Sequence, residues 1–175
     1  MMRKTISRRV LVGLGVGVLL ASVTVATALA GPSDLTRARA ATARFNSLTQ
    51  AEKAGYGLPP EGPLSQCIAS FDGTGAMGFH YINGSLLDGT VDPAKPEALV
   101  YAEDAKGQLR LVALEYVVFE SAWTAEHAPM LFGEMFMKTE APNRYEIPAF
   151  WALHVWIWED NPSGTFASFN PAVAC

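Results

Sequence analysis

Three polar side chains lie inside the most apolar stretches of the sequence. They are His80 in the segment GFHYI, Glu115 in ALEYVV and His154 in LHVWIW. A charged carboxylate in the middle of an apolar strand is destabilising unless it is paired or bound to a metal. Two imidazoles and one carboxylate on neighbouring strands would form a His₂Glu set with open coordination positions, a pattern used for catalytic Zn²⁺ and non-haem Fe²⁺. The sequence therefore predicts a metal site at His80, Glu115 and His154, with Zn, Fe or Cu as the cofactor.

Two other interpretations of the same residues stay open, because the three lie far apart in the sequence and show no metal-ligand spacing. His80 and Glu115 fit a structural pair in which the imidazole neutralises the buried carboxylate. The other alternative is an acid/base pair without metal. In that case Glu115 is the base, and burial raises its pKa.

Aromatic residues near the end of the chain indicate a ligand pocket. If residues 150–158 form a strand, Trp156 and Trp158 share one face with His154. With Tyr81, they predict the wall of a binding site for an aromatic ligand. A stripe of this kind is also typical of a core or of a protein interface, and a short helix is the alternative structure for the same residues.

Familiar catalytic and nucleotide-binding motifs are missing from the sequence. GTGAMG at residues 73–78 matches G-x-G-x-x-G by spelling. A dinucleotide site needs a strand before this motif and a helix after it, whereas here a loop precedes and a strand follows. The chain has no G-x-S-x-G, H-E-x-x-H or EF-hand sequence. The sequence therefore names no specific reaction.

The two cysteines of the chain, Cys67 and Cys175, predict a disulfide. In an oxidising compartment two cysteines most simply pair with each other. The bridge would close a loop of about 110 residues, for which the chain-entropy model gives roughly 4–5 kcal/mol. Redox-active cysteines usually occur as C-x-x-C, a spacing that is missing here.

The first 30 residues have the pattern of a signal peptide. A positive segment containing Arg8 and Arg9 precedes an uncharged stretch, which ends in the small-x-small sequence ALA at residues 28–30. We therefore predict an exported protein, either secreted or held in the periplasm or cell envelope. An uncleaved anchor is the alternative, because the 21 uncharged residues 10–30 can just span a bilayer. SRRVL at residues 7–11 also resembles a twin-arginine signal, which exports folded proteins.

The composition after the leader describes one acidic domain. Residues 31–175 number 145, the size of a single domain. The leader holds four of the 13 basic residues and none of the 17 acidic ones, so nine basic residues remain against 17 acidic and the net charge is −8. This charge excludes nucleic acid and anionic lipid as partners, because both require a basic face. No second long apolar run follows, so we predict one soluble domain with no membrane contact after cleavage.

The elements expected to carry the site are one helix and a few strands. A helix capped by Ser33 or Asp34 should run to about Ala54, because apolar residues recur at spacings of three and four. Strands are expected at residues 77–82, 98–103, 108–119 and 150–158, with the second and third as a β-hairpin. The strand at 108–119 is apolar on both faces and should be central. The predicted fold class is α+β: an N-terminal helix followed by a small, mostly antiparallel sheet, either curved or closed as a small barrel.

Several segments of the chain resemble a group of uncharacterised exported bacterial proteins. They are GFHYIN at residues 78–83, PEALVY at 96–101, EYVV at 115–118, LHVWIW at 153–158, NPSG at 161–164 and the ending NPAVAC at 170–175. The resemblance spans about residue 40 to the end of the chain. It implies a single exported domain and carries no activity and no catalytic residue with it.

These observations together predict an exported domain that binds a small ligand or a divalent metal through His80, Glu115 and His154. One alternative is an envelope or extracellular interaction protein in which the same three residues are purely structural. Another is a metal-assisted enzyme of unspecified reaction.

Overall fold

The computed structural model describes residues 33–175. The predicted signal peptide, residues 1–30, lies outside the described residues. The described part begins with helix α1 (Asp34–Thr42), the 3₁₀-helix η1 (Ala43–Asn46) and helix α2 (Leu48–Lys53). Across residues 33–175, no helix has the length and apolar character needed to cross a membrane.

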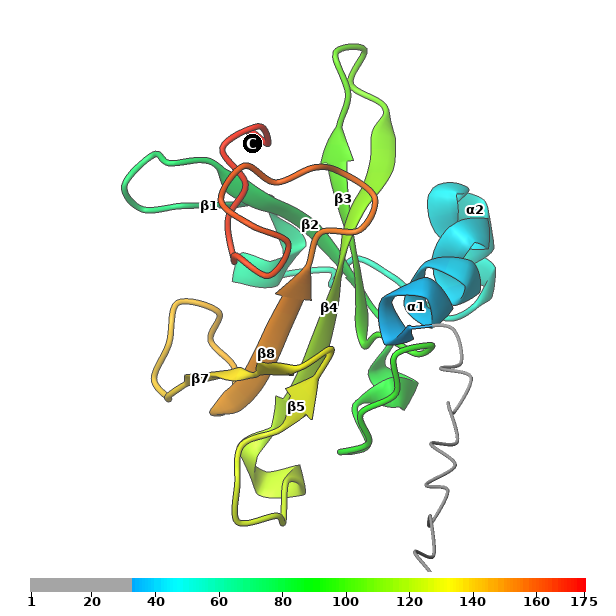
Figure 1. Cartoon of the computed structure of the whole chain (residues 1–175). Helices are drawn as coiled ribbons and strands as arrows, with labels where there is room; N and C mark the ends of the chain where they lie inside the picture. The colour runs from blue at the N-terminus through cyan, green and yellow to red at the C-terminus, as the bar shows by residue number, and fades with distance from the viewer. Residues whose placement is uncertain (1–32) are drawn as a thin grey trace, which may run out of the picture. The chain divides into compact units, whose positions relative to one another are not determined.

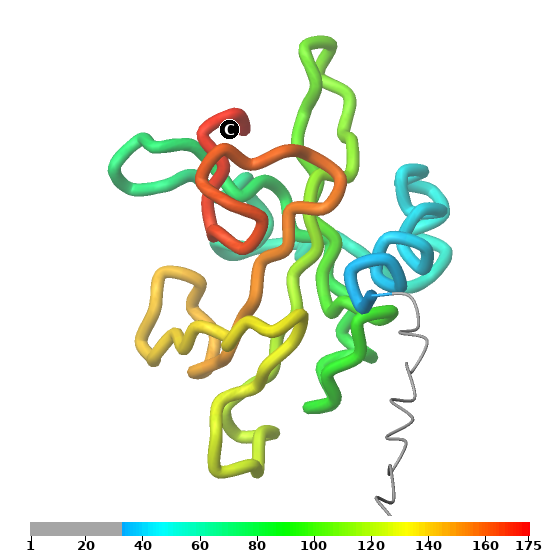
Figure 2. Tube along the Cα trace, viewed as in Figure 1, coloured from blue at the N-terminus to red at the C-terminus, as the bar shows by residue number. Residues whose placement is uncertain are grey.

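The described residues then form eight β-strands, six of which make one antiparallel sheet that curls into a half-barrel (Figures 1 and 2). The strands are β1 (Ile68–Ala69), β2 (Ala76–Ile82), β3 (Ala98–Glu103), β4 (Leu109–Phe119), β5 (Met130–Leu131), β6 (Glu134–Met135), β7 (Met137–Thr139) and β8 (Phe150–Val155). Their order in the sheet is β1-β2-β3-β4-β8-β7, while β5 and β6 pair separately. Single 3₁₀ turns, η2 (Pro63–Ser65), η3 (Gly84–Leu86) and η4 (Glu120–Ala122), lie in the connections.

The predicted hairpin and the central position of its second strand are confirmed. β3 and β4 pair around a turn in which the Asp104 carboxylate accepts hydrogen bonds from the backbone N–H groups of Lys106 and Gln108. β4 lies between β3 and β8 in the sheet. β8 is shorter than expected and ends at Val155. The next residue, Trp156, has left the sheet, because its backbone N–H donates to the carbonyl of Thr165 in the C-terminal segment.

The prediction of a single N-terminal helix up to about Ala54 is wrong in one respect, since the helical segment is broken at Ser47. Ser33 caps α1 as predicted, and its side chain accepts from the N–H of Thr36. Ser47 is extended, with φ −95° and ψ 111°. The Tyr101 hydroxyl of β3 donates to the carbonyl of Phe45 at 2.6 Å, which holds that last turn against the sheet instead of letting it continue as an α-helix.

The fold class is therefore mostly β rather than α+β. The helices are short, and the curled sheet supplies most of the regular secondary structure in the described residues. The expectation of a small, mostly antiparallel and curved sheet is confirmed, and the N-terminal helices act as a cover for one of its faces (Figure 1).

The two faces of the sheet have different roles. The face under the helices carries Leu99, Tyr101, Leu114 and Tyr116, which pack with Phe45 and form the main core. Because side chains alternate along a strand, the opposite face receives His80, Val100, Ala113, Glu115 and His154. We call this second face the cavity face. It carries the polar residues singled out in the sequence.

The C-terminal segment is fastened beside β1 and β2. Cys67 and Cys175 form the predicted disulfide. Asn170 exchanges backbone hydrogen bonds with Ala76 at the start of β2, and Val173 is buried against the cavity face. Figure 2 shows this last part of the chain, in red, next to the loop between β1 and β2.

Gly78 allows β2 to approach β3 closely. Its φ is 116°, and a Cβ at this position would clash with the carbonyl oxygen of Tyr101. We therefore expect Gly78→Ala to lower the free energy of unfolding by about 2–4 kcal/mol, because it adds backbone strain to an unavoidable clash. Urea unfolding followed by tryptophan fluorescence measures the change.

Gly73→Ala is the matched control for this prediction. Gly73 also has a positive φ, 74°, but a Cβ there would have no neighbour within 4 Å. Gly73→Ala should therefore lower the free energy of unfolding by only about 1 kcal/mol, the cost of an alanine in the left-handed backbone conformation. Equal losses in the two variants would show that the contact between Gly78 and Tyr101 is unimportant.

Candidate functional site

The structure brings His80, Glu115 and His154 together on the cavity face. Glu115 on β4 is directly opposite His154 on β8 in the strand register. His80 on β2 reaches Glu115 across β3, where the residue paired with Glu115 is the small Ala98. The Nε2 atom of His80 lies 3.2 Å from Oε2 of Glu115, and the ring centroids of the two histidines are 5.9 Å apart.

Glu115 carries a buried negative charge. Only 15% of its side chain is exposed. Burial alone would raise the pKa of Glu115, but the adjacent His80, and to a smaller extent His154, lower the pKa below its ordinary value. The expectation that burial raises the pKa of Glu115 is therefore wrong, because the effect of the neighbouring imidazoles outweighs that of burial.

His154 is a buried imidazole without a polar partner. It is 4% exposed, and neither of its ring nitrogens makes a hydrogen bond to the described residues. Burial lowers the pKa of His154 to about 4, so the ring is neutral near pH 7. Its ring contacts Trp156, with 4.8 Å between centroids. A buried, unpaired imidazole is a costly feature in a stable domain, which marks His154 as a ligand-binding candidate.

The structure supports the predicted pairing of His80 with Glu115 more directly than the predicted His₂Glu metal site. Within residues 33–175, no group of three or more His, Cys, Asp or Glu side chains is placed to hold a metal ion. The His80 N–H is also out of line for a hydrogen bond to Glu115, although the two atoms are close. His80, Glu115 and His154 thus form a loose polar cluster rather than a closed ligand set.

Two cavities open on this cluster and share Glu115, Tyr145 and Phe150 in their walls. The first, which we call the apolar cavity, has a volume of about 170 Å³ and is lined mainly by aliphatic and aromatic groups. Its walls include Ile68, Ile82, Leu87, Val117, Phe119 and Ile147, with His80 among its few polar groups.

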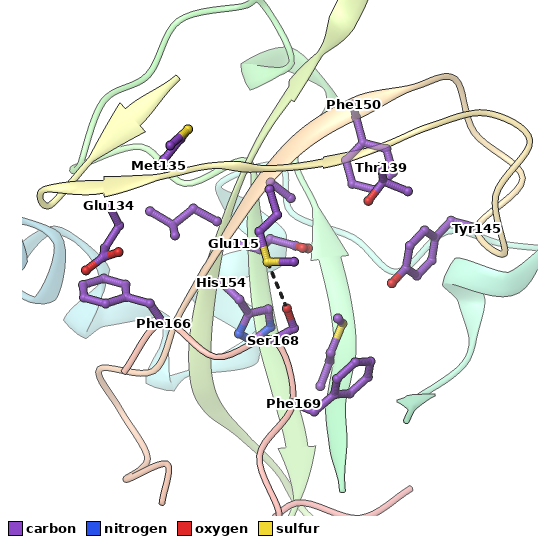
Figure 3. A pocket seen from close by; sticks show the side chains of 14 residues that line it. Glu115, Glu134, Met135, Thr139, Tyr145, Phe150, His154, Phe166, Ser168 and Phe169 are labelled. Atoms are coloured by element: carbon purple, nitrogen blue, oxygen red, sulfur yellow. Dashed lines mark hydrogen bonds between the residues drawn. The ribbon is translucent and has the colours of Figure 1, made fainter. Parts of the chain in front are cut away.

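The second cavity, which we call the methionine cavity, has a volume of about 330 Å³. Met77, Met135 and Met137 line it together with His154 and Ser168. Figure 3 shows Glu115, His154 and Ser168 in the middle of its lining, with Tyr145 and Phe150 to one side. Tyr145 and Phe150 also line the apolar cavity. Glu115 thus lies at the junction of one aliphatic and one sulfur-rich space.

No protein-family model, curated protein or solved structure matches the chain. The chemistry of the site is therefore derived from its own side chains. An ionised carboxylate between apolar walls favours a ligand that combines an apolar body with a positive charge or strong hydrogen-bond donors. The neutral ring of His154 adds one unprotonated nitrogen on the other side, which can accept a hydrogen bond or ligate a metal.

The aromatic residues predicted as ligand contacts lie elsewhere. Tyr81 is on the helix-covered face and packs against Tyr101, with 5.0 Å between ring centroids. The Trp156 ring is buried, and its Nε1 donates to the carbonyl of Ala167. Trp158 lies beyond the end of β8, where Arg39 stacks over its ring. Neither the apolar nor the methionine cavity is lined by Tyr81, Trp156 or Trp158.

Glu97 is a functional candidate that sequence reasoning missed. It directly precedes β3, is 2% exposed and lines the apolar cavity. Burial raises the pKa of Glu97 to about 8, although its carboxylate oxygen accepts a hydrogen bond from the N–H of Val117. A signal was present in the sequence, because Glu97 stands immediately before an apolar strand. The signal is weak, because Glu97 precedes the strand and does not interrupt its apolar run.

Proposed function

We propose that the protein is an exported binding protein for a small ligand with an apolar body and a cationic group. The observation that carries the proposal is the ionised, mostly buried Glu115 at the junction of two cavities. A fixed negative charge with a cavity on either side can be compensated by a ligand cation. The apolar walls then supply the rest of the binding energy.

The size of the apolar cavity supports a compact ligand. Its volume of about 170 Å³ is close to that of an engineered cavity of about 150 Å³ that binds benzene. His80 lies beside Glu115 on the β2 side and stabilises its charge before any ligand arrives. Such preorganisation increases affinity by reducing the ordering cost of binding.

The export part of the proposal rests on two features. Residues 1–30 have the charge and hydropathy pattern of a signal peptide. The Cys67–Cys175 disulfide fits an oxidising compartment, where such bonds persist.

Three probes of the same size test the charge requirement. Benzylammonium, benzyl alcohol and benzoate share an aromatic ring and differ in charge. We expect benzylammonium to bind about tenfold or more tightly than benzyl alcohol, since a hydrogen bond to a charged group contributes about 1.5–3 kcal/mol. Benzoate should bind most weakly. Chemical-shift titration of the ¹⁵N-labelled protein gives the three dissociation constants.

Two variants separate charge from shape in this experiment. Glu115→Gln should remove the preference for benzylammonium over benzyl alcohol, whereas Val117→Phe should fill the apolar cavity and weaken all the probes alike. Glu140→Gln is the control, because the Glu140 side chain is 70% exposed and lines neither of the two cavities. A preference for benzylammonium that survives in folded Glu115→Gln, or no binding of any probe to the native chain, would refute the proposal.

A further inference from the structure

The methionine cavity contains thioethers that are unusually exposed. Met135 and Met137 are 62% and 65% exposed at its rim, and Met77 lines it from β2. Methionine is normally a core residue, so solvent-facing methionines gathered around one cavity call for an explanation other than packing. Thioether sulfur is a soft ligand and selects Cu(I) among the common biological metals.

The strand register places Met137 within reach of His154. Met137 on β7 is paired with Ala152 on β8, two residues before His154 on the same face of the strand. Such diagonal neighbours lie roughly 7–8 Å apart, a distance that long side chains span. Met135 precedes Met137 by two residues and lines the same cavity. Methionine has three rotatable bonds, so its sulfur can turn toward a shared ion.

His154 is the second, independent feature that indicates a ligand. Its ring lines the methionine cavity, is 4% exposed and has no hydrogen-bond partner on either nitrogen among the described residues. Figure 3 shows His154 beside Ser168, and the dashed line marks the contact of the Ser168 hydroxyl with the sulfur of Met137 at 3.9 Å. The His154 ring and the Met137 thioether therefore line the same cavity.

We propose that His154, Met77 and Met137 bind one Cu(I) ion in the methionine cavity, with Met135 closing the site from the rim. No group of three or more His, Cys, Asp or Glu side chains in residues 33–175 is placed to hold a metal, and the thioethers supply further donors. Glu115 and Glu134 also line the cavity and give it a negative potential that favours a cation. The site differs from the His80, Glu115 and His154 set, because soft sulfur replaces the second imidazole and the carboxylate.

This inference goes beyond the proposed binding of a small organic cation, which occupies the apolar cavity. The test is an anaerobic titration of the full mature chain, disulfide intact, with Cu(I) in competition with bicinchoninate. We expect one Cu(I) per chain. Met137→Leu and Met77→Leu preserve volume and remove one sulfur each, and each should weaken binding by about 10- to 100-fold, at least as much as loss of an outer-sphere partner does.

Met130→Leu is the matched control. Met130 is also exposed, at 61%, but does not line the methionine cavity, so its replacement should leave Cu(I) affinity unchanged. As a second readout, Ag(I) added to protein with ¹³C-labelled methionine methyl groups should shift the signals of Met77 and Met137 and leave that of Met130 in place. This readout needs no substitution and is unaffected by a variant that fails to fold.

Three results would overturn the copper site. They are the absence of stoichiometric Cu(I), an equal loss of affinity in Met130→Leu, and Zn²⁺ binding as tight as Cu(I), since Zn²⁺ has little preference for thioethers. Benzylammonium binding to Met137→Leu distinguishes this failure from failure of the proposed function. The probe should bind that variant normally whether or not copper binds the native chain.

Discussion

Replacing Glu97 by glutamine is expected to stabilise the protein above pH 7 and to remove much of its pH dependence between pH 5 and pH 9. Burial raises the pKa of Glu97 from 4.5 to about 8, with further upward contributions from the negative charges of Asp88 and Glu115. The unfolded chain therefore loses this proton at lower pH than the folded chain. The contribution of protonated Glu97 to the free energy of unfolding is fully present below pH 4.5 and is lost as the pH rises to about 8.

The size of this effect follows from the interval between the two pKa values. An interval of 4.5 to about 8, at about 1.4 kcal/mol per pKa unit, corresponds to roughly 3–5 kcal/mol. Glutamine keeps an acceptor oxygen for the Val117 N–H and has no proton to lose. The buried hydroxyls of Tyr56 and Tyr116 do not compete in this range, because burial raises the pKa of each above its ordinary value of 10.

Urea denaturation at pH 5, 7 and 9 measures the prediction. Native protein should lose roughly 3–5 kcal/mol more than Glu97→Gln between the lowest and highest pH. Glu103→Gln, at the exposed end of β3, is the control and should keep the native pH dependence. Parallel pH profiles for native protein and Glu97→Gln would show that Glu97 is ionised in the folded state and that its burial is compensated.

The hairpin and the helix cap were predictable because they depend on neighbouring residues. Asp104 and Gly107 define a turn between two apolar runs, and those runs became β3 and β4. Ser33 precedes a run of helix-forming residues and caps α1. Such signals act over a few residues, so the sequence contains all the information they need.

The break at Ser47 was not predictable, because a partner distant in the sequence causes it. The apolar spacing of residues 35–51 fits one helix, but the hydroxyl of Tyr101, 56 residues after Phe45, donates to the Phe45 carbonyl. The ladder of β7 with β8 was missed for a similar reason. Residues 137–139 show no strand pattern of their own and pair only because β8 offers a free edge.

The sequence predicted which residues form the candidate site, but it did not predict how they are arranged. Polar residues in apolar strands identified His80, Glu115 and His154, and strand pairing brought all three onto one face. Their spacing could not reveal that the neighbouring histidines would lower the pKa of Glu115 by more than burial raises it. Met77, Met135 and Met137 were not predicted as site residues, because single apolar residues give no functional signal in a sequence. Only the folded chain places them around the same cavity as His154.

Removal of the Cys67–Cys175 disulfide is expected to lower the free energy of unfolding by about 4–5 kcal/mol. The bridge joins residues 108 positions apart, and the chain-entropy model assigns a loop of about 100 residues roughly 4.7 kcal/mol. It also holds the final residues, where Val173 is buried and Asn170 pairs with Ala76. A loss of this size is comparable with the total stability of many small domains, so the reduced protein should melt at a much lower temperature.

The double variant Cys67→Ser/Cys175→Ser separates the bridge from side effects of reducing agents. Its unfolding free energy in urea should equal that of native protein in excess dithiothreitol, and dithiothreitol should leave the variant unchanged. A loss below about 1 kcal/mol would mean that the Asn170–Ala76 hydrogen bonds and the burial of Val173 hold the C-terminal segment without the bridge. Trp156 donates to the carbonyl of Ala167 and shares a buried cluster with Val173. The expected loss of about 4–5 kcal/mol should therefore be accompanied by increased exposure of Trp156, which fluorescence quenching detects.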